Sequence, residues 1–500
     1  MFNFFEEYFY LHIEFILFIS GLICLLYSIY DKKFNINYFS IENIKMYILN
    51  AMLVFFIIGW QLYIKLPLLD INKTSIDILH LNNLFIFSTF NCYIKIFILV
   101  FTIIYLFIVY DYFKNDKFYF AEYIVGIYFL IGSMFLFISS YDFFIAYLII
   151  ELQAFIYYYL FTLLSKRVIV LEAVSKYFIL NVFASLILIL GISLIYGSCG
   201  STKFIEIGIL YVEQSASNMF TVGIFFFLIG IFFKLAIVPF HYRIGDIYEG
   251  LPLIVIIYYS VISKIPYLIF IISLLDIIKF SIVFYNLIFF VALLSILYSS
   301  LIVLYEINIM RILAYSAISH LGYILLSFSF NTLNGIVLGI NYLFVYSISI
   351  FGTLLILYII KIYNINNGYS NFWNIVDIIK FSKFSKMNYF ITVMLVSFLL
   401  SFIGIPPFAG FFIKMNIFIE VIKSCHYFIF IILGFISVIN AVFYLRLIRF
   451  LLFNKENDIK LSSWNLSLNI VFWVIVFCFI FNLSFFFFQS IILYKILLIL

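Results

Sequence analysis

The stretch that decides the fold is Gly230–Gly250, GIFFKLAIVPFHYRIGDIYEG. It begins with apolar residues of the kind that cross a membrane, and Lys234 lies among them with no acidic residue nearby in the chain. Five residues later, Pro239 lacks the N–H that the carbonyl oxygen of Leu235 would accept in a continuous helix. A backbone group without its helical partner is tolerated at membrane depth only inside protein or beside water. A cation beside a broken apolar helix is therefore typical of an ion path through a membrane protein.

The composition of the whole chain agrees with a membrane protein. Of its 500 residues, 67% are hydrophobic and 10% are charged, and the mean hydropathy is +1.23. Soluble globular proteins are about half apolar and about a quarter charged, so that class is excluded. No basic segment with interleaved aromatic residues stands in a solvated region, which argues against a nucleic-acid partner.

Runs of about 20 apolar residues predict the membrane spans. They indicate an all-α polytopic membrane protein with about 14 transmembrane helices. The predicted spans cover 8–30, 46–64, 91–111, 119–139, 142–164, 173–196, 219–240, 251–274, 281–305, 312–330, 334–360, 388–419, 426–453 and 466–489. Because the loops are short and no Gly/Ser or Pro-rich linker divides the chain, we predict a single transmembrane domain over residues 1–500.

The twelfth predicted span is interrupted like the seventh. Its sequence SFIGIPPFAGFFIKM places Pro406 and Pro407 shortly before Lys414. The two prolines leave the carbonyl oxygens of Phe402 and Ile403 without helical donors. Two interrupted spans, five apart, are expected of a transporter with inverted repeats. We therefore predict two inverted five-helix repeats, each with a broken helix, at 119–274 and 281–453, preceded by three helices in 1–118 and followed by a last helix in 454–500.

Five ionisable side chains lie in the interiors of five different predicted spans. They are Glu151, Lys234, Lys264, His320 and Lys414. One such charge at the bilayer centre costs from about 3 to above 10 kcal/mol, so each needs a partner, water, or loss of its charge. Burial disfavours the charged form, and each group could then gain and lose a proton near neutral pH. The alternative is that each is a buried, satisfied polar residue that fixes helix packing; five of them beside two broken helices favour a proton relay.

Other charged residues in or near spans are weaker candidates. Lys95 is expected to extend from its span's end to the membrane surface, and Glu14 to reach the interface. Lys176 is expected to pair with Glu172 on the same helix face.

Two acidic residues follow the interrupted seventh span. We expect Asp246 and Glu249 to satisfy loop backbone or to pair with Arg243 rather than to transfer protons.

Neither the cysteines nor the histidines form a recognisable ligand set. None of the five cysteines lies in a CxxC pair, which leaves a zinc site or an iron–sulfur cluster without support. No two of the five histidines share an apolar segment, so a haem held by paired histidines is disfavoured. The chain also lacks a Walker A loop and a GxGxxG motif after a strand. We expect no metal, no bound cofactor and no redox chemistry in this chain itself.

The lysines and arginines of the loops predict the orientation. With fourteen spans, most of them fall on one side, and only Lys65, Lys73, Lys203, Lys279 and Lys423 fall on the other. Basic loops stay on the side of synthesis, so both termini are expected on the opposite side. The N-terminus lacks a basic region and a cleavage site, which indicates a retained first span.

Six segments together resemble a known family. They are ELQ at 151–153, LEAVSKYFILNVFASLILILGISLIYG at 171–197, FKLAIVPFHYRIGDIYEGLP at 233–252, VISKI at 261–265, RILAYSAISHLGY at 311–323 and SFIGIPPFAGFFIKMNIF at 401–418. They are similar to the antiporter-like membrane subunits of proton-pumping NADH:quinone oxidoreductase, respiratory complex I. The resemblance covers roughly residues 119–453. A loop that usually reads like WAPD in that family reads RIGD at 243–246 here.

The resemblance implies roles for the five buried groups. Glu151 and Lys234 would form the pair of one half-channel, Lys264 and His320 would lie on a central hydrophilic axis, and Lys414 would lie in the other half-channel. It also implies a chain that is driven by quinone reduction in neighbouring subunits. NADH, FMN, iron–sulfur clusters and ubiquinone would be bound by those partners, which include other antiporter-like subunits of the membrane arm.

The resemblance further implies a place in the mitochondrial inner membrane, in contact with its lipids, with both termini toward the intermembrane space. Two alternatives stay open at this point. One is a stand-alone cation/proton antiporter subunit of the multisubunit type, which shares this fold. The other is a purely structural membrane subunit whose channel is unused.

Overall fold

The structure is a computed structural model that describes residues 2–34, 41–71, 78–80, 83–113, 120–163, 168–213, 218–277, 282–366, 389–453 and 470–499. These residues are almost entirely helical, with one short hairpin formed by β1 (Ile78–His80) and β2 (Phe85–Phe87). Within them, thirteen helices are long and apolar enough to cross a membrane. The protein is therefore an all-α polytopic membrane protein.

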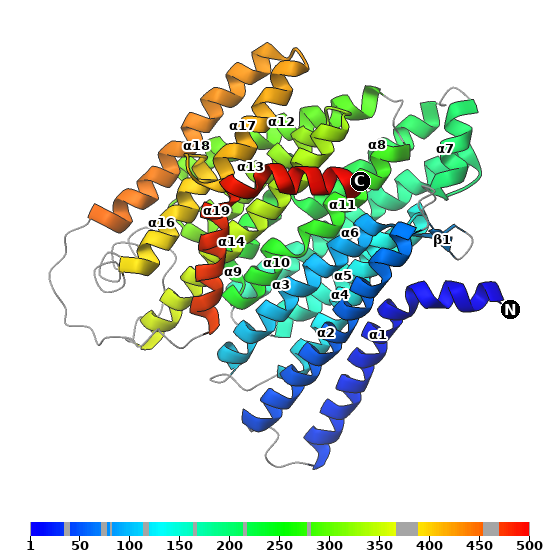
Figure 1. Ribbon diagram of the computed structural model, residues 1–500, viewed down its shortest axis with the longest axis horizontal. Coiled ribbons are helices and arrows are strands. Elements are labelled where there is room, and N and C mark those ends of the chain that lie inside the picture. Colours follow the sequence, from blue (N-terminus) through cyan, green and yellow to red (C-terminus); the bar gives the residue numbers. More distant parts are fainter. Residues whose placement is uncertain are drawn as a thin grey trace. The chain divides into compact units, whose positions relative to one another are not determined.

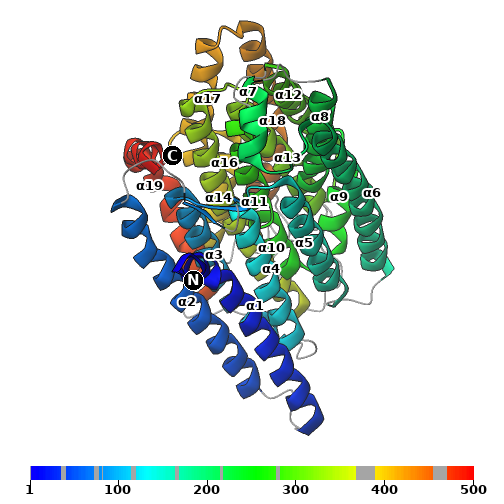
Figure 2. The same ribbon diagram turned by 90° about the vertical axis from the view of Figure 1, so that its right-hand side faces the viewer.

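The chain divides into two compact units, and Figure 1 shows their helices coloured along the sequence. The first unit comprises Met1–Leu235 and Ile262–Lys279. Its helices are α1 (Phe2–Phe34), α2 (Ile41–Ile71), α3 (Thr89–Phe113), α4 (Phe120–Ser139), α5 (Phe143–Leu163), α6 (Val168–Cys199), α7 (Phe204–Glu213), α8 (Asn218–Leu235) and α11 (Lys264–Ile277). Helices α1, α2, α3 and α4 run alongside one another in both views (Figures 1 and 2), and α11 packs against α4, α7 and α8.

The second unit comprises Ala236–Val261 and Phe280–Leu500. Its helices are α9 (Tyr242–Gly250), α10 (Leu253–Val261), α12 (Ile282–Tyr305), α13 (Ile309–Phe328), α14 (Leu333–Asn366), α16 (Tyr389–Ile403), α17 (Ala409–Lys423), α18 (Tyr427–Phe453) and α19 (Ile470–Ile499). Helix α14 is central to this unit, because it packs against α10, α13, α16, α17 and α19.

Local sequence sets the helix ends near the site. Asp142 begins α5, where its Oδ1 accepts hydrogen bonds from the backbone N–H groups of Phe144 and Ile145 at 2.7 and 3.1 Å. Asn308 begins α13 in the same way, through the N–H of Met310 at 3.1 Å. A side-chain oxygen at this position satisfies one of the donors that every helix start leaves unpaired.

Three of the predicted spans are broken within the described residues. Helix α8 ends at Leu235 and α9 begins at Tyr242. Leu235 is the residue whose carbonyl oxygen receives no hydrogen bond from Pro239, because proline has no N–H. Helix α16 ends at Ile403 and α17 begins at Ala409, on either side of Pro406. Both of these interruptions follow the prediction from the prolines.

The third break lies at Ile262, the residue whose carbonyl oxygen would accept the N–H that Pro266 lacks. The span predicted as a continuous helix over 251–274 is divided into α10 and α11 by a turn at Ile262 and Ser263. Pro266 lies in the first turn of α11, where proline is tolerated because no helical partner is required of its nitrogen. The break therefore places Lys264 at the very start of a helix.

Two glycines allow the chain to turn between α16 and α17. Gly404 has a φ of +87°, a backbone conformation that side chains disfavour. Gly410 lies so close to α16 that a Cβ added there would be 1.8 Å from the carbonyl oxygen of Ser401. Any side chain at Gly410 would push the two halves of the broken helix apart.

The fourteen predicted spans and the thirteen long helices differ at residues 388–419, where the chain forms the two shorter helices α16 and α17. The thirteen include Leu253–Leu275, which counts as one span although the turn at Ile262 and Ser263 divides it into α10 and α11. The boundary predicted at 118/119 lies outside the described residues, as do the loop lysines Lys73 and Lys279. Of the boundary predicted at 453/454, the structure describes only Phe453, the last residue of α18. The inverted repeats stay a prediction.

Candidate functional site

Glu151 and Lys234 form an ion pair inside the first unit. Lys234 lies in the last turn of α8 and Glu151 near the middle of α5, and their Nζ and Oε1 atoms are 3.2 Å apart. The lysine side chain is 3% exposed and the glutamate side chain 20%. The pair joins two helices that are 83 residues apart in the chain. Each charge thus has the opposite charge that membrane burial requires.

Lys264 lies in the same unit, at the first residue of α11, and is buried. Helix α11 packs against α8, the helix that carries Lys234. The turn at Ile262 and Ser263 lies directly before the lysine. Lys264 is therefore held at a helix break, as Lys234 is, on the neighbouring helix.

His320 lies in the second unit on α13, between two tyrosines. Its Nδ1 is 2.8 Å from the hydroxyl oxygen of Tyr342 on α14, and its Nε2 is 3.3 Å from that of Tyr444 on α18. The rings of Tyr346 and Phe402 lie 5.0 and 5.1 Å from the imidazole ring. Both ring nitrogens are thus in hydrogen bonds with groups that can donate or accept a proton.

Lys414 closes the break between α16 and α17. Its Nζ donates hydrogen bonds to the carbonyl oxygens of Phe402 and Ile403 at 2.5 and 3.0 Å. These are the two carbonyls that Pro406 and Pro407 deprive of their helical donors. An ammonium group in this place satisfies both acceptors and keeps its own charge beside two dipoles.

A small cavity lies between His320 and the broken helix of Lys414. It is lined by His320, Tyr342, Tyr346, Ser349, Ser401, Phe402, Gly410 and Ile413, with Val345. Phe402 connects the two groups, because its ring contacts His320 and its carbonyl accepts from Lys414. Lys414 also lies over the ring of Tyr323, 5.5 Å from its centre, one turn after His320 on α13. The second unit thus connects two of the five predicted residues through Phe402, beside a small cavity that His320 lines.

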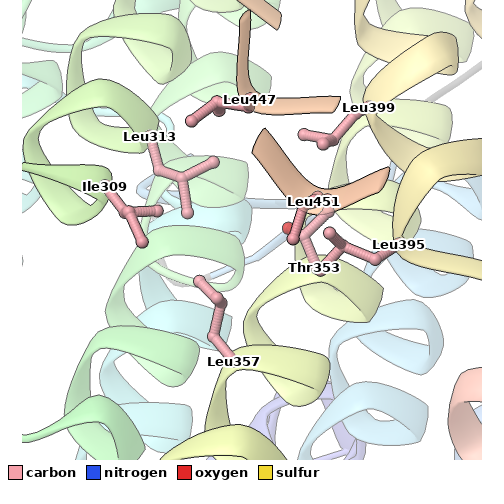
Figure 3. Close-up of a pocket in the computed structure, with 8 residues that line it drawn as sticks. All are labelled: Ile309, Leu313, Thr353, Leu357, Leu395, Leu399, Leu447 and Leu451. Atoms are coloured by element: carbon pink, nitrogen blue, oxygen red, sulfur yellow. The ribbon is translucent and has the colours of Figure 1, made fainter. Parts of the chain in front are cut away.

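A second cavity in this unit has the opposite character (Figure 3). It is lined by Ile309, Leu313, Thr353, Leu357, Leu395, Leu399, Leu447 and Leu451, which come from α13, α14, α16 and α18. The hydroxyl of Thr353 donates to the carbonyl of Ile350 in its own helix, at 2.8 Å. Apolar cavities of this kind stay dry. Its residues Ile309 and Leu313 lie in the first turns of α13.

The structure corrects the predictions for Glu14 and Lys95. Both were expected at the membrane surface, but each side chain is only 2% exposed. The Nζ of Lys95 on α3 is 2.6 Å from Oε1 of Glu14 on α1. The sequence could not show this pairing, because the two residues are 81 positions apart and lie on different helices.

The remaining charged candidates are arranged as surface pairs. Lys176 pairs with Glu172 at 2.7 Å on the exposed face of α6, as expected. Asp246 and Glu249 on α9 both pair with Arg311 at the start of α13, at 3.6 and 2.5 Å. The sequence did not suggest Arg311 as their partner. It ties the short helix α9 to α13.

Several polar side chains around the site were not predicted. The chain has 41 tyrosines, so nothing in the sequence distinguishes Tyr342 and Tyr444 as partners of His320. Asn482 on α19 accepts a hydrogen bond from the N–H of Ala409 at 3.2 Å, and so it caps the second half of the broken helix. A buried asparagine inside an apolar span was the only available sequence signal for that cap. Within the described residues, no three His, Cys, Asp or Glu side chains are grouped as metal ligands would be.

The chain is similar to known membrane proteins over the region that contains these side chains. A family model described as NADH:quinone oxidoreductase/Mrp antiporter, transmembrane, matches residues 140–440. The chain is 34% identical over 403 residues to NADH-quinone oxidoreductase subunit N of Orientia tsutsugamushi, which covers 78% of this chain and 82% of that one. It is 30% identical over 407 residues to NADH-ubiquinone oxidoreductase chain 2 of Oenothera berteroana, which covers 79% and 81%.

A solved structure shares the fold. A chain of respiratory complex I from Thermus thermophilus with bound aureothin superposes with a TM-score of 0.74 at 18% sequence identity, over 96% of this chain and 98% of that one. The matched family region contains Glu151, Lys234, Lys264, His320 and Lys414. It does not contain α1, α2 or α3.

Proposed function

Because this chain belongs to the NADH:quinone oxidoreductase/Mrp antiporter family of transmembrane subunits, we propose that it is the chain 2 (subunit N) member of a mitochondrial NADH:ubiquinone oxidoreductase. In that complex it translocates protons across the inner membrane, coupled to electron transfer from NADH to ubiquinone. It is a subunit of an H⁺-translocating enzyme and has no redox centre of its own.

The observation that carries the proposal is the ion pair between Glu151 and Lys234. Two unit charges 3.2 Å apart interact by about 5 kcal/mol at an effective dielectric of about 20. A charge that arrives from a neighbouring subunit and draws Glu151 away removes that stabilisation of the ammonium. Lys234 then releases its proton. When the carboxylate returns, it again favours the ammonium form, so Lys234 takes up a new proton and the charged pair is restored.

The remaining residues continue the proton path. Lys264, at the break on the helix beside α8, receives the proton from Lys234. In the second unit, His320 passes a proton between its two ring nitrogens and the hydroxyls of Tyr342 and Tyr444. Lys414 gives up its proton at the broken helix, where the carbonyls of Phe402 and Ile403 hold it in place in either state. Pro239, Pro406 and Pro407 keep both helices open at these lysines.

The partners follow from the same assignment. The chain is a subunit of a multisubunit membrane complex, and we place it in the membrane arm of complex I beside other antiporter-like subunits, with both termini toward the intermembrane space. NADH, FMN, the iron–sulfur clusters and ubiquinone are bound by partner subunits. The test of this assignment is whether the chain co-purifies in a large membrane complex that oxidises NADH.

Proton pumping is tested by removing the lysine of the ion pair. In vesicles that contain the assembled complex, Lys234→Met is expected to reduce NADH-driven proton uptake at least about tenfold. Lys176→Met is the matched control, because Lys176 forms a similar pair with Glu172 on the same unit but at the exposed surface. Equal pumping by Lys234→Met and wild type would contradict the proposed function and favour a structural subunit.

The family description also includes Mrp antiporters, so an antiporter is a second candidate function. A stand-alone cation/proton antiporter would exchange Na⁺ or K⁺ for H⁺ in vesicles without NADH. The proposed subunit of complex I is expected to move protons only when NADH is oxidised, at a rate that does not depend on which of the two cations is present.

A further inference from the structure

Tyr323 on α13 contacts both of the titratable groups that the second unit brings together, one directly and one through a neighbour. Its side chain is completely buried. The ammonium of Lys414 lies over its ring, 5.5 Å from the ring centre. On its other side the ring stacks on that of Tyr342, with 6.0 Å between the centres and 21° between the planes. Tyr342 is the tyrosine whose hydroxyl oxygen lies 2.8 Å from Nδ1 of His320.

The shorter connection between Lys414 and His320 runs through Phe402, which has no proton to transfer. The carbonyl oxygen of Phe402 accepts a hydrogen bond from Lys414, and its ring lies 5.1 Å from the imidazole ring. Neither a phenyl ring nor a carbonyl oxygen has a hydrogen that it can donate. A proton that moves between Lys414 and His320 therefore needs a hydroxyl group or a water molecule beside them.

The serine hydroxyls of the cavity beside His320 donate within their own helices. Ser401 donates to a backbone carbonyl oxygen of α16 at 2.7 Å. Ser349 donates to two backbone carbonyl oxygens of α14 at 2.6 and 3.1 Å. Bonds of this kind hold the hydroxyl hydrogen on the local backbone. The tyrosines are therefore the better proton carriers, and Tyr323 is the one that contacts Lys414.

The hydroxyl of Tyr323 has no structural bond that accounts for its burial. Its oxygen is buried and has no hydrogen-bond partner in the part of the chain that the structure describes. Buried hydroxyls are normally hydrogen-bonded, because an unpaired one destabilises the fold. The ammonium of Lys414 has three hydrogens. Within the same described residues it donates two of them, to the carbonyl oxygens of Phe402 and Ile403. An unpaired hydroxyl thus lies beside an ammonium that has one hydrogen left to donate.

We propose that Tyr323 is a proton-carrying residue that connects Lys414 with His320 through Tyr342. His320 begins as the neutral imidazole with its hydrogen on Nε2. The third N–H of Lys414 turns to the hydroxyl oxygen of Tyr323 and its proton is transferred there, while the hydroxyl proton of Tyr323 moves to the oxygen of Tyr342. The hydroxyl proton of Tyr342 then binds Nδ1 of His320. Lys414 is left as the neutral amine, His320 becomes the imidazolium, and both tyrosines end neutral.

The inference rests on the proposed proton-carrying function, and its test separates the hydroxyl of Tyr323 from its ring. Tyr323→Phe keeps the ring under the ammonium and removes the hydroxyl, whereas Tyr323→Leu removes both. Each variant is assembled in the complete complex. NADH-driven proton uptake by vesicles and thermal unfolding are then measured on the same preparations. Tyr305→Phe on α12, where 85% of the residue is exposed, is the control.

We expect Tyr323→Phe and Tyr323→Leu to lower proton uptake by at least about threefold, and Tyr305→Phe to behave as wild type. The melting temperature of Tyr323→Phe is expected to equal or exceed that of wild type, because the variant loses a buried hydroxyl that has no partner. Wild-type uptake by Tyr323→Phe together with reduced uptake by Tyr323→Leu would assign the role to the ring and overturn the inference. A lower melting temperature in Tyr323→Phe would show that the hydroxyl forms a structural bond, which also contradicts it.

Lys234→Met in the same preparation distinguishes this inference from the proposed function. If Lys234→Met pumps as wild type, the proposed function itself fails. If Lys234→Met loses pumping while Tyr323→Phe retains it, only the assignment of Tyr323 is wrong.

Discussion

The ammonium nitrogen of Lys414 lies 2.5 Å from the carbonyl oxygen of Phe402, which Pro406 deprives of its helical donor. A second bond of 3.0 Å reaches the next carbonyl, that of Ile403. One side chain therefore supports the open ends of a broken helix and, in the proposed mechanism, carries a proton. These two roles make separate predictions.

Lys414→Met is expected to lower both stability and pumping. It leaves two buried carbonyl oxygens without donors, at about 1–3 kcal/mol for each. Lys414→Arg keeps donors at the break and is expected to remain near wild-type stability, but it cannot release a proton. Thermal unfolding and proton uptake are measured on the same preparations. Normal pumping by Lys414→Arg would remove Lys414 from the proton path.

Gly410→Ala is expected to disrupt the broken helix. The added Cβ would be 1.8 Å from a backbone oxygen of Ser401, and backbone cannot move aside as a flexible side chain can. Overpacking of this kind costs about 1–3 kcal/mol or more. Gly434→Ala on α18 is the control, since a Cβ there has no neighbour within 4 Å. Assembly and thermal unfolding report the difference, and equal stability of the two variants would show that α17 can shift.

Tyr342→Phe is expected to slow pumping more than Tyr444→Phe does. Both remove a hydroxyl from His320, but the bond to Tyr342 is 2.8 Å and that to Tyr444 is 3.3 Å. Loss of such a bond is worth about 0.5–1.5 kcal/mol, which corresponds to a rate lower by about twofold to tenfold. Tyr305→Phe, an exposed hydroxyl on α12, serves as the control. A faster rate in either variant would mean that the tyrosines restrain His320 instead of relaying its proton.

Because His241 is buried, we expect the stability of the second unit to depend on pH. Burial lowers its pKa below the usual 6.5, although a hydrogen bond to the backbone of Pro239 acts in the opposite direction. The unfolded chain therefore binds a proton that the folded chain resists, so stability is present above pH 6.5 and is lost as the pH falls through the folded-state pKa. His241→Phe keeps a ring against Tyr242 and Tyr298 but cannot titrate.

The measurement for His241 is thermal unfolding of the complex at about pH 7.5 and about pH 5.5. We expect the loss of melting temperature on acidification to be smaller in His241→Phe than in wild type. His426→Phe, at an exposed histidine of the same unit, is expected to leave the loss unchanged. A similar loss in all three proteins would assign the acid sensitivity to other groups.

The sequence predicted most of the architecture, because apolar length and proline position are local properties. Pro239, Pro406 and Pro407 located two helix breaks, and the carbonyls of Phe402 and Ile403 were identified as needing new partners. That Lys414 is the partner depends on how α17 folds back onto α16, which no local pattern specifies.

Pairings between distant helices were the part that the sequence could not predict. Glu14 and Lys95 each lie near the end of a predicted span, and either could have reached water if its helix had been rotated. Only the packing of α1 to α4 excludes both side chains from the surface. His320 was predicted as a titratable group, but its tyrosine partners come from other helices, Tyr342 on α14 at 22 residues' separation and Tyr444 on α18 at 124.

The central claim is that the charge on Glu151 controls a proton on Lys234, and Glu151→Gln tests it most directly. The amide keeps the size of the side chain and removes the charge 3.2 Å from the lysine. The measurement is NADH-driven proton uptake by vesicles that contain the assembled complex, with Glu172→Gln at the exposed pair as control. The account predicts a loss of at least about tenfold in Glu151→Gln and none in the control. Proton uptake at the wild-type rate in Glu151→Gln would contradict it.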